Sequence, residues 1–176
     1  MALAPLVEDY LHRHGAKYDV VAHPRSTHSS ETAALAGIPG DRLVKSVVLR
    51  DDDDGVLLAV LASTLSVHIG QLSEETHRRL RLADEGDLQG VFPDCSLGAI
   101  PPLGPAYGVR IILDDSLDAQ EDLWFEAGDH EHLVHMTAGQ FMALVGPAQK
   151  VHFGVTTLRQ GDPRRPPGHG STPPSR

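Results

Sequence analysis

The chain has few of the features that mark secreted or membrane proteins. Its 176 residues include a single cysteine, Cys95, which excludes an internal disulfide and is typical of a reducing compartment. The longest apolar run, residues 56–62, is far too short to cross a bilayer. The first residues carry no basic group ahead of their apolar stretch, which is untypical of a secretory signal. These absences predict a cytoplasmic protein with no membrane partner.

Basic residues are also scarce, and the net charge is −9. Residues 1–158 hold 11 Lys and Arg against 23 Asp and Glu, whereas residues 159–176 hold four Arg and one Asp. Binding along a nucleic-acid duplex needs a basic surface, so a DNA partner is not expected. A small contact with the end of a nucleic acid stays open, because it needs only a few local basic groups.

The length and composition fit one globular domain. Hydrophobic residues make up 40% and charged residues 22% of the chain, which is ordinary for a soluble protein with a single core. The tail differs, because residues 159–176 are rich in proline, glycine and arginine and contain no apolar residue that could anchor a core. We therefore predict one domain over residues 1–158, followed by a disordered tail.

Helical and strand patterns alternate along this domain. Two apolar runs are joined by four aspartates and a glycine, which predicts a β-hairpin. The mixture of helices and hairpins predicts an α+β fold, with a mixed, curled and partly barrel-like β-sheet surrounded by helices. The expected helices cover residues 5–14 and 30–36 (capped by Ser29 or Ser30 and stopped by Gly37), a segment from Ser73 through Arg81, and a segment after the capping box Thr137–Gln140; the expected strands cover residues 18–22, 43–50, 56–63, 109–113 and 132–136.

Lys45 lies inside the first strand of the predicted hairpin. Alternation places it with Val47 and Leu49 on one face, and both faces of the strand are otherwise largely apolar. The strand is therefore expected to be central and covered on both sides. A lysine in this position must find a partner, lower its pKa or reach a cleft. The alternative is a lysine near the strand end whose ammonium group reaches water.

A loop rich in small residues and proline follows, over residues 91–105. Its central part, Gly98 to Pro102, has backbone N–H groups that bulky side chains do not shield. Such a loop can direct amide donors at a developing oxyanion or allow a substrate to approach the backbone. The alternative is a plain connector, because glycine and proline are common in long loops.

Histidines gather between Gly128 and His135. On a strand His130 and His132 would share a face, so they could ligate zinc or another transition metal with a third residue from elsewhere. The alternative is a polar strand end with exposed histidines, and the helical zinc spacing His-Glu-x-x-His is absent. Cys95 has no evident base nearby and is more typical of core packing.

In their order along the chain, these residues resemble the YbaK/prolyl-tRNA-synthetase-associated domain family, the free-standing aminoacyl-tRNA deacylases related to the editing insertion of bacterial prolyl-tRNA synthetase. The resemblance covers about residues 5–154. No single motif is decisive, and the resemblance rests on the order of several elements along the chain. These are His23-Pro24 with Thr27, then the segment 33–38, then Lys45 in an apolar strand, then Gly98-Ala99-Ile100-Pro101-Pro102 with Leu103-Gly104, and finally Gly128-Asp129-His130.

The resemblance implies the mixed, partly closed sheet and a trans-editing deacylase. Such an enzyme hydrolyses the ester between a small mischarged amino acid (Ala, Ser, Thr or Cys) and the tRNA 3′ end, and the 2′-hydroxyl of the tRNA helps to activate water. No cofactor and no metal are then expected, and the partners would be the aminoacyl-tRNA acceptor end and an aminoacyl-tRNA synthetase. Lys45, Gly98 and Ala99 would be catalytic, and the substrate-binding residues would be His23, Thr27, Ser46, Ile100, Pro101, Pro102, Gly104, Gly128, Asp129 and His130.

Departures from the family pattern leave two other functions open. Residues 63–68 lack the basic residues that many relatives carry, and Ser46 follows Lys45 where relatives often differ. A non-catalytic, tRNA-binding member of the same fold would also fit the acidic body of the chain. A metal-dependent hydrolase using His130 and His132 is the third hypothesis.

Overall fold

The computed structural model describes residues 3–156, and its centre is an eight-stranded mixed sheet. The strands follow the order β1-β8-β7-β2-β3-β6-β9, with β5 paired to β2, and β10 and β4 form a separate two-stranded sheet. The strands are β1 (Asp19–Ala22), β2 (Leu43–Arg50), β3 (Val56–Ala62), β4 (Leu65–Val67), β5 (Arg81–Leu82), β6 (Arg110–Asp114), β7 (Asp122–Glu126), β8 (His132–Thr137), β9 (Gln149–Val151) and β10 (Gly154–Thr156).

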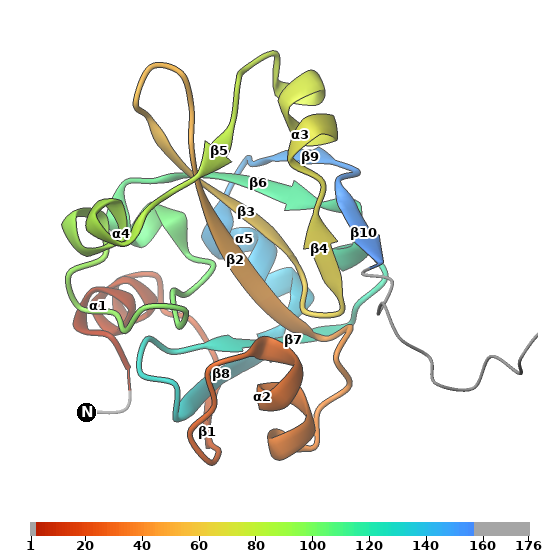
Figure 1. The fold of residues 1–176 in the computed structure, drawn as a ribbon. Helices are drawn as coiled ribbons and strands as arrows, with labels where there is room; N and C mark the ends of the chain where they lie inside the picture. The colour runs from red at the N-terminus through yellow and green to blue at the C-terminus, as the bar shows by residue number, and fades with distance from the viewer. Residues whose placement is uncertain (1–2, 157–176) are drawn as a thin grey trace, which may run out of the picture.

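Helices surround this sheet. Figure 1 shows the β2–β3 hairpin running through the middle of the molecule, with α5 behind it and α2 and α3 at opposite ends. The helices are α1 (Pro5–Arg13), α2 (Ser29–Ala36), α3 (Ile69–Thr76), α4 (Glu85–Val91) and α5 (Ala138–Val145), with short 3-10 turns at Gly104–Tyr107 and Asp115–Leu117.

The predicted hairpin is the centre of the sheet. β2 and β3 pair antiparallel from Val44 opposite Ala62 to Arg50 opposite Val56. β2 also pairs parallel with β7, and β3 pairs parallel with β6, so both hairpin strands are internal. The sheet ends at β1 and β9, which makes it open rather than a closed barrel. The predicted mixed sheet surrounded by helices is confirmed.

Both faces of β2 are covered, as the sequence predicted. Val44 and Val48 belong to the large core that also contains Leu11 of α1 and Phe141 of α5. Leu49 faces the opposite way, into a second core with residues of β3, α3 and the segment before β10. The largely apolar sequence of this hairpin follows from that double burial, because both of its faces pack against other elements.

Three details of the prediction were wrong. The helix expected from Ser73 begins at Ile69 and ends at Thr76, because the His68 ring accepts the Gln71 N–H as a cap and His77 turns the chain with a φ of 54°. The cap residue of α2 is His28, so Ser29 and Ser30 are helical, although Gly37 ends the helix as expected. The prediction also missed α4 and the strands β4, β5, β7, β9 and β10 altogether.

The capping box at α5 is half present. The Thr137 hydroxyl accepts the Gln140 N–H at 3.2 Å, as predicted. The Gln140 side chain does not close the box, because its Oε1 accepts the backbone N–H of Lys17 instead. None of the helices within residues 3–156 is long and apolar enough to span a bilayer. The predicted tail, residues 159–176, lies outside the described residues, as does the boundary at residue 158.

Candidate functional site

Lys45 lies near the start of β2, opposite Leu61 of β3. Its ammonium group donates to the backbone oxygen of Ser63 at 3.4 Å, which is a long contact. Within residues 3–156 no carboxylate oxygen lies within 4.0 Å of it. Burial therefore lowers the pKa of Lys45 without a compensating negative charge. Of the three outcomes the sequence allowed, the lysine lowers its pKa and reaches a cleft.

That cleft is a cavity of about 570 Å³ between the start of α2 and the turn from β3 to β4. Its wall is polar, because six of the nine lining residues carry a hydroxyl group. The N-cap residue of α2, His28, makes no side-chain capping hydrogen bond, and it lines the cavity together with the first two residues of the helix. The lining residues are Thr27, His28, Ser29, Ser30, Lys45, Ser63, Thr64, Leu65 and Ser66.

The Gly98–Pro102 loop lies on the opposite face of β2. The Ser46 hydroxyl donates to the backbone oxygen of Ile100, and both residues line a smaller hollow of about 200 Å³ together with Gly98. Lys45 does not line this hollow. The two regions meet at Thr27, since a Cβ placed on Gly98 would lie 4.0 Å from the Thr27 backbone oxygen.

The loop has fewer free N–H groups than its sequence suggested. The Ala99 N–H donates to the Ser96 oxygen at 3.1 Å, and Pro101 and Pro102 have no N–H. This leaves Gly98 and Ile100 as the donors between residues 98 and 102. Gly98 has a φ of 84°, and its absent side chain leaves room for the His130 ring, whose Cε1 would lie 3.3 Å from a Cβ.

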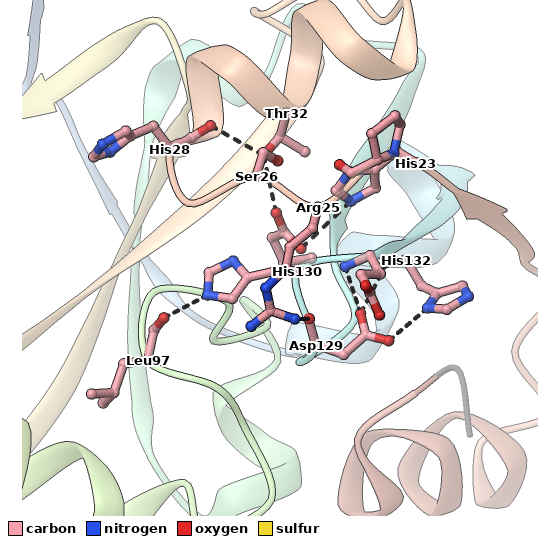
Figure 2. Close-up of polar contacts among 12 residues, drawn as sticks. His23, Arg25, Ser26, His28, Thr32, Leu97, Asp129, His130 and His132 are labelled. Atoms are coloured by element: carbon pink, nitrogen blue, oxygen red, sulfur yellow. Dashed lines mark hydrogen bonds and ion pairs between the residues drawn. The ribbon is translucent and has the colours of Figure 1, made fainter.

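The His130 ring holds this loop in place through a hydrogen bond to its backbone. Its Nε2 contacts the Leu97 oxygen at 2.6 Å, and because a carbonyl oxygen only accepts, the ring nitrogen is the donor. Figure 2 shows the ring directed at Leu97, with Asp129 and His132 forming a separate pair. His130 precedes β8 and has a φ of 66°, so it does not share a strand face with His132. The prediction that the two histidines share a face was wrong.

The Asp129 side chain stabilises the turn in which it lies. Burial would raise its pKa, but hydrogen bonds from the backbone N–H groups of Glu131 and His132, and from the His132 ring at 2.6 Å, hold the pKa of Asp129 below its usual value. Within residues 3–156, Asp114, Asp115 and His152 form a group of three possible metal ligands. Neither His130 nor His132 belongs to such a group within that range.

Three other expected site residues lie away from the cavity wall. The His23 side chain is fully buried, and its Nδ1 donates to the Pro24 oxygen at 2.8 Å. A Cβ on Gly104 would lie 2.4 Å from the Val109 oxygen, and one on Gly128 would lie 2.8 Å from the Ala4 Cβ. Both glycines therefore permit close packing of the chain. Of the predicted residues, the structure brings Lys45 together with Thr27, and Ser46 together with Gly98 and Ile100.

Sequence reasoning missed most of the cavity wall. Residues 63–66 follow β3 directly, and three of the four carry a hydroxyl group; their sequence indicated only a lack of basic residues. The start of α2 was considered only for capping. Cys95 behaves as expected of a packing residue, because burial raises the pKa of its thiol to about 12 and its sulfur contacts the Tyr107 hydroxyl at 3.1 Å.

Comparison with known proteins identifies the domain. The sequence model of the family described as "Aminoacyl-tRNA editing domain" matches residues 23–144. The chain belongs to this family. The match spans Lys45, the Gly98–Pro102 loop and His130, so the resemblance seen in the sequence is confirmed.

Individual relatives agree with the family. The chain is 27% identical over 122 residues to a proline–tRNA ligase of Thiobacillus denitrificans (strain ATCC 25259 / T1), a match that covers 69% of this chain and 21% of the ligase. The editing domain thus spans about a fifth of that relative. A solved structure described as a candidate trans-editing enzyme for prolyl tRNA synthetase has a TM-score of 0.76 at 25% identity, covering 86% of this chain and 96% of that one. A scaffold used for computational grafting of linear epitopes shares the fold, with a TM-score of 0.76 at 21% identity, over 88% of this chain and 97% of the scaffold.

Proposed function

We propose that this editing domain is a trans-editing aminoacyl-tRNA deacylase. It would hydrolyse the ester that joins a small mischarged amino acid, such as alanine, serine, threonine or cysteine, to the 3′ end of a tRNA. The observation that carries the proposal is Lys45, a half-buried ammonium group that has no carboxylate oxygen within 4.0 Å among residues 3–156 and lines a polar cavity of an editing domain. A cation that the protein leaves unpaired is available to an anionic or strongly polar group of a substrate.

The geometry supports a division of work between the two faces of β2. Lys45 would hold the terminal nucleotide in the hydroxyl-lined cavity, and the reacting ester would extend past Thr27 to the loop on the other face. The N–H groups of Gly98 and Ile100 would stabilise the oxyanion of the tetrahedral intermediate, since the N–H of Ala99 is already bonded to Ser96. An aminoacyl ester is an activated acyl donor, so positioning and an oxyanion site can be sufficient without a protein nucleophile.

Water would be activated by the 2′-hydroxyl of the tRNA, as the family resemblance implies. Cys95 is a poor nucleophile in this setting, because its raised pKa leaves little thiolate at neutral pH. The overall acidity of the chain suits a contact restricted to the acceptor end. An aminoacyl-tRNA synthetase would be a further partner.

The test is hydrolysis of a panel of mischarged tRNAs by the wild type, by Lys45→Ala and by the control Lys17→Ala, which removes an exposed lysine outside the cavity. We expect the wild type and the control to deacylate at least one small aminoacyl-tRNA, and Lys45→Ala to lose about 100-fold in rate, as for loss of one transition-state contact. Equal rates for all three proteins would contradict the role of Lys45. Binding of every charged species without turnover would instead identify a non-catalytic tRNA-binding domain.

A further inference from the structure

Glu126 is a buried acid that neither lines the cavity nor belongs to the expected site. It ends β7, and its side chain is only 12% exposed. Its Oε1 accepts from the Thr32 hydroxyl at 3.2 Å, while its Oε2 is buried with no hydrogen-bond partner. A buried carboxylate that has one oxygen without a hydrogen-bond partner lowers the stability of the fold, so a functional role for Glu126 is expected.

Thr32 connects Glu126 to the cavity. Its hydroxyl lies in α2, is buried, and contacts the Ser26 hydroxyl at 2.7 Å (Figure 2). The chain between Ser26 and Thr32 contains the four cavity-lining residues 27–30. Both ends of this short segment therefore meet at one point. The Thr32 hydroxyl shares its proton between the His28 oxygen of its own helix, at 3.1 Å, and Glu126, and the second of these contacts links this point to β7.

The contact between Ser26 and Thr32 is also connected to the Gly98–Pro102 loop. The Ser26 N–H donates to the backbone oxygen of His130 at 3.4 Å, and the His130 ring in turn holds Leu97. Contacts of Glu126 thus continue through Thr32 and Ser26 to both walls of the candidate site. A shift of this anchor would move Thr27 relative to Gly98, where the two regions meet.

His23 occupies the other side of Glu126. Its Nδ1 donates to the Pro24 oxygen, so in the neutral ring Nε2 is an acceptor, and it faces Glu126 Oε2 at 3.9 Å. Both atoms are buried and lack a hydrogen-bond partner. Two acceptors in this arrangement repel each other unless one of them carries a proton. A proton on either side chain removes this repulsion, although the 3.9 Å separation is too long for a hydrogen bond between the two atoms.

Burial favours the protonated form of Glu126. It raises the pKa of Glu126 to about 7, the Thr32 hydrogen bond opposes this rise, and the charge of Asp129 adds to it. Among residues 3–156, the titratable groups that face Glu126 are His23, which follows β1, and Asp129, in the turn before β8. From α2 it meets the uncharged hydroxyl of Thr32.

We propose that Glu126 is a positioning residue of the candidate site: by holding Thr32, it keeps the cavity-lining segment 27–30 in the geometry that binds aminoacyl-tRNA. This inference rests on the proposed function for its catalytic readout. It also makes substrate binding sensitive to pH, because loss of the Glu126 proton strengthens the hydrogen bond from Thr32 and at the same time places a carboxylate opposite the Nε2 lone pair of His23, so the geometry of the anchor changes.

The test compares Glu126→Ala, which removes the anchor, with Glu126→Gln, which keeps both hydrogen-bonding ends without titrating. Glu121→Gln is the matched control, since Glu121 is an exposed acid next to the same strand. With the tRNA that the wild type deacylates fastest, we expect Glu126→Ala to raise KM about tenfold with little change in kcat, as for loss of one buried hydrogen bond. Glu126→Gln and the control should keep the wild-type KM at pH 6.

The pH profile separates positioning from general stability. Between pH 6 and pH 8 the KM of the wild type and of Glu121→Gln should change with the titration of Glu126, whereas that of Glu126→Gln should stay constant. If Glu126→Ala lowers the melting temperature but leaves KM unchanged, or if Glu126→Gln follows the wild-type profile, the proposal is wrong. Should Glu126→Ala fail to fold, Thr32→Val breaks the same contact at an isosteric position and is expected to give the same rise in KM.

Hydrogen exchange tests the anchor without any substrate. In Glu126→Ala, backbone amides in the peptide covering residues 26–32 should exchange about tenfold faster than in the wild type, with Glu126→Gln unchanged. Unaltered exchange in Glu126→Ala would overturn the positioning role. If the wild type deacylates no tRNA while exchange responds as expected, the proposed function fails and the anchor stands.

Discussion

Replacing Glu126 by glutamine should make the protein more stable at neutral pH, by an amount that depends on pH in a defined way. The pKa of Glu126 is raised from 4.5 to about 7 in the folded protein, mainly by burial. Between these two values the folded state holds a proton that the unfolded state releases. Stability therefore falls as the pH rises from 4.5 to 7, and is constant above that range.

The magnitude follows from the shift. One pKa unit corresponds to about 1.4 kcal/mol, so the loss of wild-type stability across this range is about 3 kcal/mol. Glutamine has the shape of the protonated acid and does not titrate. We expect the two proteins to be equally stable near pH 4.5, and Glu126→Gln to be more stable by about 3 kcal/mol at pH 7 and above, or roughly 6–12 °C in melting temperature.

Urea unfolding of both proteins at half-unit steps from pH 4.5 to 8 measures this directly. Titrations elsewhere in the molecule cancel in the difference between the two curves, so only the contribution of Glu126 remains. Glu121→Gln should differ from the wild type by a constant amount across the series. A constant difference for Glu126→Gln as well, or a greater stability of the wild type at pH 7.5, would show that Glu126 does not hold a proton in the folded state.

Three further substitutions have expected outcomes. Lys45→Met should raise the free energy of unfolding by about 1 kcal/mol, because it removes a half-buried charge with no carboxylate within 4.0 Å among residues 3–156, while deacylation is lost; reduced stability in thermal denaturation would contradict this. Gly98→Ala should cost about 1–2 kcal/mol and lower kcat, since its φ of 84° and the nearby His130 ring disfavour a side chain; unaltered kinetics would show that the loop tolerates a shift. Thr137→Ala should lower the free energy of unfolding by about 1 kcal/mol through loss of the α5 cap, with deacylation unchanged. Urea denaturation measures this loss, and an unchanged stability would show that α5 does not depend on the hydrogen bond between Thr137 and Gln140.

The local elements were predictable where one signal dominated. The β2–β3 hairpin follows from two apolar runs joined by an aspartate turn, and Gly37 ends α2 because glycine adopts its φ of 66° without strain. The helix at Ile69 was misplaced because its cap is a histidine ring, His68, which is an uncommon capping group. β7 was missed although β8 follows it directly, because its other neighbour is β2, which lies far earlier in the chain and gives β7 its internal place in the sheet.

The sequence by itself determined the chemistry available to this protein: a lysine in an apolar strand, a glycine- and proline-rich loop, and no dedicated nucleophile. Their order along the chain was enough to identify the family. Tertiary structure decided which groups meet. It placed the hydroxyls of residues 63–66 and the start of α2 around Lys45, left Gly98 and Ile100 as the free donors of the loop, and set His23 and Thr32 against Glu126. Such contacts depend on the pairing of distant strands and on burial, which raises or lowers a pKa only after the chain has folded.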